Sequence, residues 1–147
     1  MTKRLLVAPA ALGLVLALVL TGCGQDAGAR YCSALNAQQS IFADDGTGLE
    51  LITNLAALKT LAADAPDDLR DEWQTFIAAL QSLHDAIAAA HLRPRDFVNG
   101  KPPAGTPESA VTSVAAAANE LSAPDVVDAA TGIEQQAKDV CQFQIGL

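Results

Sequence analysis

Apolar residues at helical spacing constrain the fold of this chain more than any other feature of its sequence. In residues 69–87 they recur at alternating intervals of four and three, which places them along one face of an α-helix. The positions are Leu69, Trp73, Phe76, Leu80, Leu83 and Ile87. The pattern predicts a helix from Pro66 to His91, because proline suits a first helical turn. A narrow stripe with a period near 3.5 residues is typical of helices that pack in a bundle.

Four less regular stripes predict four further helices, near residues 29–42, 47–62, 106–121 and 122–140. Thr47 and Glu50 have the spacing of a capping box at the start of the second of these segments in the chain. The positions expected to face the core are Tyr31, Leu35, Gln38 and Phe42, then Leu51, Leu55, Leu58 and Ala62, then Val111, Val114, Ala118 and Leu121, and finally Val126, Ala130, Ile133, Ala137 and Val140. No segment is read as a strand. We therefore expect an all-α fold, a compact bundle of four to five amphipathic helices.

The first 22 residues are read as a secretion signal. Lys3 and Arg4 form a positive start, and the apolar stretch Leu5–Leu20 is shorter than the roughly 20 residues that a membrane span needs. What remains after residues 1–22 is the length of a single domain. We expect residues 23–29, which are small and turn-prone, to form a tether, and residues 30–147 to form the helical-bundle domain.

The segment Leu20-Thr21-Gly22-Cys23 resembles the lipobox, the cleavage site of bacterial lipoproteins. The resemblance implies that the Cys23 thiol receives diacylglycerol and that Cys23 becomes the first residue after cleavage. Acyl chains such as palmitate would then hold the protein to the outer face of the cell membrane, since two or more chains make a stable anchor. A signal that remains as a membrane anchor is the alternative, and the lipobox disfavours it.

Cys32 and Cys141 are the cysteines left once Cys23 is assigned to lipid. An even pair in an oxidising compartment predicts one disulfide, which would join the two ends of the domain. The alternative is two free thiols that serve as metal ligands or as a redox pair. Their wide separation and the absence of a Cys-x-x-Cys motif favour the disulfide.

The whole layout is similar to that of the small alanine-rich lipoproteins of high-GC Gram-positive bacteria. Members of that group have a lipobox, a short tether, a Tyr-Cys pair, several amphipathic helices and a late cysteine. In this chain the matching residues are Leu20 to Cys23, Tyr31-Cys32 and Cys141. The resemblance implies this architecture and a place in the bacterial cell envelope. It implies no activity, because the group has no assigned one.

The charge of the chain excludes one class of partner. Nine Lys and Arg, of which Lys3 and Arg4 lie in the expected signal, stand against seventeen Asp and Glu. Binding to nucleic acid needs clustered Lys and Arg, so we expect no nucleic-acid partner. The same acidity opposes adsorption to anionic lipid headgroups. Attachment to a membrane is therefore expected to be covalent, through the acyl anchor on Cys23.

Four residues are candidates for contact with a ligand or partner: Phe97, Lys101, Trp73 and His84. The segment Asp96–Pro103, which holds the first two and is stiffened by proline, is a candidate partner surface, because functional residues concentrate on such loops. The alternative is a crossover between helical pairs, with Phe97 as a plug. Trp73 could stack on a sugar, although its place in the stripe favours the core.

His84 and His91 lie on one face of the predicted helix, about 10 Å apart along its axis. Metal ligands stand about 2 Å from their ion, so these two side chains alone cannot hold one. We expect polar positions beside the apolar stripe, with no metal site and no cofactor. If a haem were bound, the two histidines or Tyr31 would be its candidate ligands.

The sequence shows no pattern typical of an enzyme. No serine has a Gly-x-Ser-x-Gly setting, and no glycine-rich loop could cradle a phosphate. We expect a non-enzymatic envelope protein that binds another protein or a cell-wall component. The alternative is a carrier of a small ligand (haem, metal or lipid) with a pocket between helices. A cavity lined by Trp73, Phe76 or His84 would favour the carrier, and an exposed apolar patch around Phe97 would favour the interaction module.

Overall fold

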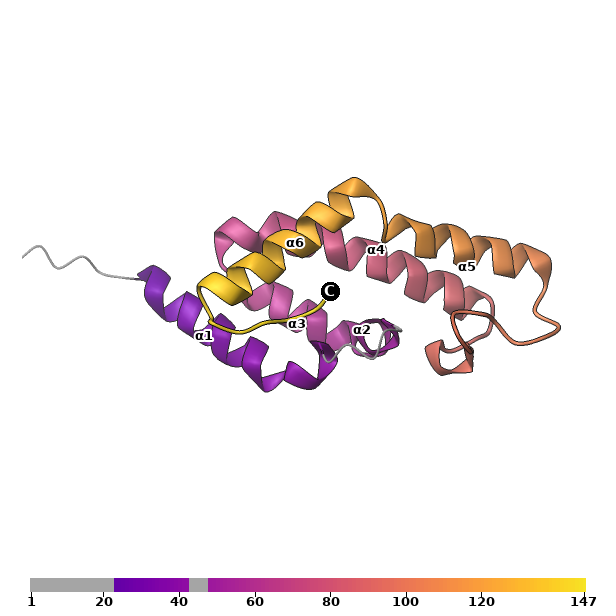
Figure 1. Cartoon of the computed structure of the whole chain (residues 1–147), viewed down its shortest axis with the longest axis horizontal. Coiled ribbons are helices and arrows are strands. Elements are labelled where there is room, and N and C mark those ends of the chain that lie inside the picture. The colour runs from indigo at the N-terminus through magenta and orange to yellow at the C-terminus, as the bar shows by residue number, and fades with distance from the viewer. Residues whose placement is uncertain (1–22, 43–47) are drawn as a thin grey trace, which may run out of the picture.

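The computed structural model describes residues 23–42 and 48–147, and these form an all-α bundle, as the sequence predicts (Figure 1). The α-helices in these two ranges are α1 (Cys23–Ala37), α2 (Leu49–Thr53), α3 (Leu55–Asp64), α4 (Arg70–Ala89), α5 (Glu108–Glu120) and α6 (Pro124–Asp139). Short 3-10 helices add η1 (Gln39–Phe42), η2 (Asp67–Leu69) and η3 (Pro94–Asp96). No strand occurs within the described ranges, and none of their helices is long and apolar enough to span a membrane.

The central element is α4, which packs against α2, α3, α5 and α6. In Figure 1, α5 and α6 follow one another along one side of α4, while α1 and α3 lie on the other side. The stripe predicted in residues 69–87 is confirmed, since every one of its positions is buried: Leu69, Trp73, Phe76, Leu80, Leu83 and Ile87. A helix covered on several faces is held chiefly by burial of its apolar side chains.

A buried hydrogen bond connects α1 to α4. The indole Nε1–H of Trp73 donates to the hydroxyl of Tyr31 over 2.9 Å, and both residues are 0 % exposed. The two rings meet edge to face with centroids 6.5 Å apart, and Phe76 continues the cluster from Trp73 at 6.4 Å. Burial raises the pKa of Tyr31 to about 12, because a phenolate there would lose its hydration; the contact with Trp73 acts in the opposite direction.

The predicted disulfide between Cys32 and Cys141 is confirmed, with the two Cα atoms 5.1 Å apart at a sequence separation of 109. It ties α1 to the segment that follows α6. Cys32 directly follows Tyr31, so two adjacent residues attach α1 to the central helix and to the end of the last helix.

The segment predicted as one helix over residues 47–62 is divided into α2 and α3 at Asn54. The amide nitrogen of the Asn54 side chain donates to the backbone oxygen of Glu50 (2.9 Å) and to its carboxylate (3.1 Å). Such local side-chain bonds compete with the helical backbone ladder. Thr47, the other half of the expected capping box, lies outside the described residues, and α2 begins after Gly48 with no side-chain cap.

Some alanine and valine positions predicted for the core are wrong. In α5 the buried alanine is Ala117, while Ala118 is exposed. Val140, predicted to end the stripe of the last helix, is 61 % exposed because α6 ends at Asp139 and Val140 stands beyond it. Residues 23–29, expected as a turn-prone tether, lie within α1. Alanine suits both a helical surface and a helical core, so it marks a buried face weakly.

The last seven residues form an extended tail that the sequence interpretation missed. Phe143, Ile145 and Leu147 alternate along it and pack, partly buried, against the core. The backbone N–H of Phe143 donates to the carbonyl of Ala137 (3.0 Å), and that of Leu147 donates to the Glu134 carboxylate (2.8 Å). Figure 1 shows the tail returning from the end of α6 toward the middle of the molecule.

The raised pKa of Tyr31 predicts a loss of stability at alkaline pH. The folded protein keeps the phenolic proton at pH values where the unfolded chain has lost it, so stability is intact below pH 10.0 and falls as the pH rises toward about 12. A shift of this size corresponds to roughly 3 kcal/mol. Urea unfolding across this pH range should show a fall in the free energy of unfolding of the native protein. The part of that fall due to the phenol should be absent from Tyr31→Phe.

Tyr31 is the one tyrosine in the chain, so phenolate absorbance reports its titration alone. An absorbance midpoint near the ordinary tyrosine value would contradict the buried environment. Tyr31→Phe should also be less stable at neutral pH by roughly 1–3 kcal/mol, because it leaves the Trp73 N–H buried without an acceptor.

Candidate functional site

An open groove with a volume of about 530 Å³ runs between α3 and α4. Its apolar lining residues are Ala62, Ala63, Trp73, Ile77 and Ala78, and its polar ones are Lys59, Arg70, Gln74 and Gln81. The alanine side chains are short, so they leave a furrow between the two helices, while the long polar side chains stand at its rim. We call this site the α3–α4 groove.

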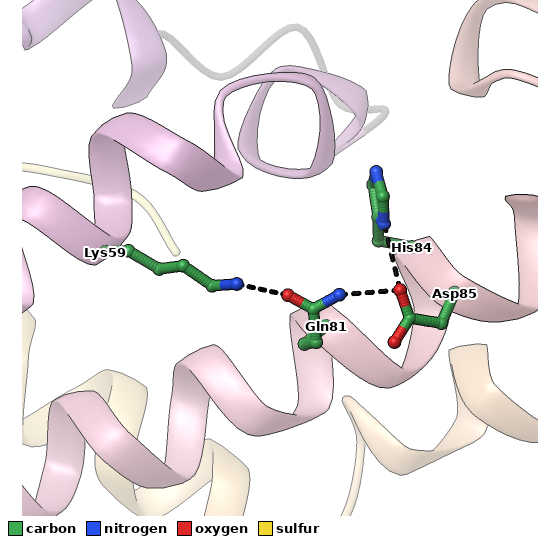
Figure 2. Close-up of polar contacts among 4 residues, drawn as sticks. All are labelled: Lys59, Gln81, His84 and Asp85. Carbon is green, nitrogen blue, oxygen red and sulfur yellow. Dashed lines mark hydrogen bonds and ion pairs between the residues drawn. The ribbon is translucent and has the colours of Figure 1, made fainter.

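A chain of polar contacts forms at the Lys59 end of the groove (Figure 2). The Lys59 ammonium donates to the Oε1 atom of Gln81. The Gln81 Nε2 atom donates to Asp85 over 2.6 Å, and the same carboxylate oxygen lies 3.2 Å from Nδ1 of His84. Figure 2 shows Gln81 between the lysine and the carboxylate. The hydrogen bond from His84 lowers the pKa of Asp85, with Gln81 adding to the effect.

The lining of the groove has the opposite charge to the chain as a whole. Lys59 and Arg70 line it, and among the described residues no Asp or Glu does. The whole chain carries a net charge of −8. Arg70 forms an ion pair with Asp67 one turn away, whereas Lys59 meets the neutral amide of Gln81.

A neighbouring cleft of about 690 Å³, at the start of α1, differs from the groove in the charges of its lining residues. Asp64, Asp67 and Asp68 line it together with Arg30 and Arg70. Carboxylates there balance the arginines. The cationic character therefore belongs to the α3–α4 groove and does not extend to this cleft.

Two of the residues singled out from the sequence lie at or beside the groove. Trp73 contributes to the lining although it is 0 % exposed as a residue, so it also fills the core position that its spacing favours. His84 is half-exposed and lies beside the groove, in contact with Asp85. Phe76 is buried and does not line the groove.

The other two, Phe97 and Lys101, lie in the connection between α4 and α5. Phe97 is half-buried and packs against the core, while Val98 is 70 % exposed. Val98 and Lys101 exchange backbone hydrogen bonds of 2.9 and 3.0 Å across Asn99 and Gly100. Positive φ values of 51° and 73° at those two central residues match a type I′ turn, for which Asn-Gly is the favoured sequence.

The start of this connection is also ordered. The backbone N–H of Arg93 donates to the Asp96 carboxylate over 2.8 Å, and its guanidinium lies 3.1 Å from the same group. These contacts with Arg93 lower the pKa of Asp96. Phe97 directly follows Asp96 and packs, partly buried, against the core.

His91 is exposed just beyond α4, with a positive φ of 58°. In residues 23–42 and 48–147, no group of three or more His, Cys, Asp or Glu side chains is arranged to hold a metal ion. Cys23 is the first residue of α1.

Sequence reasoning missed Lys59, Gln81 and the alanines of the groove. The spacing of Gln81 and Asp85 is that of neighbours on one helix face, which is a signal for their contact. No local pattern indicates that Lys59 meets Gln81, because that contact depends on how α3 and α4 pair.

Replacing Phe97 with Ala tests whether this side chain is a plug. We expect a loss of about 2 kcal/mol in the free energy of unfolding, below the cost for a fully buried phenylalanine because Phe97 is half-buried. The matched control Val98→Ala, at a site that is 70 % exposed, should change stability by less than about 0.5 kcal/mol. Urea unfolding measures both. Unchanged stability in Phe97→Ala would contradict the plug and would favour a role of Phe97 in partner binding.

The chain matches no protein-family model, no curated protein and no solved structure with which it was compared. Its function is therefore inferred from its own residues.

Proposed function

We propose that this protein is a lipid-anchored binding protein of the bacterial cell envelope, held on the outer face of the membrane through Cys23 and acting by binding rather than by catalysis. The α3–α4 groove is its binding surface. The observation that supports this choice is the combination of apolar lining residues with two cations and, in the part of the chain that the structure describes, no carboxylate in the lining. A site of this size, largely apolar with a few polar groups at its edge, suits a small ligand.

The groove favours a carrier over a module that binds a partner at Phe97. Trp73 lines the groove, which is the feature expected of a carrier. Phe97 instead packs against the core, so it offers a partner only part of its surface. Val98 is exposed beside it, but one valine makes a small patch.

The anchor is proposed from the lipobox, and α1 is compatible with it. Cys23 begins α1, and Tyr31, eight residues further along that helix, is buried. Eight residues of helix rise about 12 Å, so a lipid on Cys23 would keep the bundle close to the bilayer.

Metabolic labelling with an alkyne analogue of palmitate tests the anchor. We expect label on the native protein and none on Cys23→Ser, since the thiol is the acceptor in the proposed reaction. The control is the double variant Cys32→Ser/Cys141→Ser, which removes the other two cysteines and should keep the label. Label that persists in Cys23→Ser would refute lipidation at this residue.

Native mass spectrometry tests the groove as a binding surface. The segment Gly24–Leu147, exported without lipid, keeps both disulfide cysteines and every buried residue of the described core. We expect a bound non-covalent mass when it is isolated from the envelope of its host. Ala78→Phe, which places a ring in the groove, should lose that mass, whereas Ala116→Phe on the exposed face of α5 should retain it. A bare protein would refute the carrier.

A further inference from the structure

We propose that the α3–α4 groove binds a single-chain anionic amphiphile, a free fatty acid, with its carboxylate at Lys59 and its chain along the apolar floor beside Trp73. This inference rests on the proposed function, in which the groove is the binding surface, and it names the class of ligand.

Charge selects an anion. The chain has seventeen Asp and Glu against nine Lys and Arg, yet the described residues that line the groove include two cations and no acid. Arg70 is paired with Asp67, so Lys59 supplies the positive charge that would attract an anionic group to the groove.

The contacts of the two cations select the end at which the carboxylate binds. Arg70 already pairs with Asp67, so its charge is balanced locally. Lys59 donates to the neutral amide of Gln81, and the nearest carboxylate in that chain of contacts, Asp85, lies on the far side of the amide. The Lys59 charge reaches Asp85 across the amide, where it is the smallest contribution to the lowered pKa of that carboxyl, so the ammonium can donate to a ligand carboxylate as a second partner.

The shape of the groove selects a narrow chain. From Arg70 to Gln81 the α4 backbone rises about 16 Å, which gives the length of the site. The groove itself holds about 530 Å³, and its floor consists of alanines, Ile77 and Trp73. An extended hydrocarbon chain fits this space and gains from the apolar contact.

Trp73 is the one tryptophan in the chain and it lines the groove, so its fluorescence reports occupancy directly. The probe is 9,10-dibromostearate, whose bromine atoms quench indole fluorescence at short range. It is added to the Gly24–Leu147 domain below the concentration at which the probe self-associates. We expect saturable quenching that unlabelled stearate reverses and that dodecyltrimethylammonium, a cationic amphiphile, does not.

Two matched variants test the position of the carboxylate. Lys59→Gln should raise the dissociation constant by tenfold or more, as expected for the loss of a hydrogen bond to a charged group. Lys138→Gln, which removes a cation from α6 outside this groove, should leave the dissociation constant unchanged. Equal affinities for Lys59→Gln and the native domain would overturn the assignment of Lys59.

The remaining outcomes separate this inference from the proposed function. Absence of saturable quenching, with a bound mass still lost in Ala78→Phe, would overturn the fatty acid and leave the groove as a binding surface. Absence of both would overturn both. Quenching by vesicles of brominated phosphatidylcholine, without quenching by dibromostearate, would show that the face docks on a bilayer and would overturn the proposal.

Discussion

The buried hydrogen bond between Tyr31 and Trp73 is the contact on which the arrangement of this bundle depends. It fixes α1 against α4, the helix on which most other elements pack, in a region that excludes water. Neither polar group could be buried there alone without a large cost, so each side chain requires the other. The adjacent disulfide at Cys32 then ties the end of α6 to the same turn of α1. Two consecutive residues of α1, Tyr31 and Cys32, thus contact α4 and the segment that follows α6.

The same contact determines one wall of the groove. Trp73 is held in the core by Tyr31, and although it is 0 % exposed it contributes to the lining between α3 and α4. The connection from α3 to α4 is short and contains Pro66, which ends one helix and precedes the next. The two helices therefore lie close together, and alanines on their facing edges leave the furrow open. A residue that holds the fold together also lines the proposed binding surface.

The sequence predicts those features whose signal lies within one element. The stripe at residues 69–87 has large apolar side chains at every position, so its buried face is unambiguous. In α5, alanines are numerous and the pattern has little contrast, which explains the exchange of Ala118 for Ala117. The division at Asn54 depends on a side-chain hydrogen bond that competes with the helix. The groove could not be predicted, because Lys59 and Gln81 are ordinary surface residues until α3 and α4 pair.

The role of Gln81 follows from where it stands. A carboxylate in direct contact with Lys59 would hold the ammonium equally well but would cancel its charge at the mouth of the groove. The amide accepts from Lys59 with its oxygen and donates to Asp85 with its nitrogen, so it orients both groups and separates them. His84 holds the far side of Asp85, so this carboxylate has partners on its own helix. Lys59 is thus held at the groove without direct contact with a carboxylate, which is the property that the proposed binding of an anion requires.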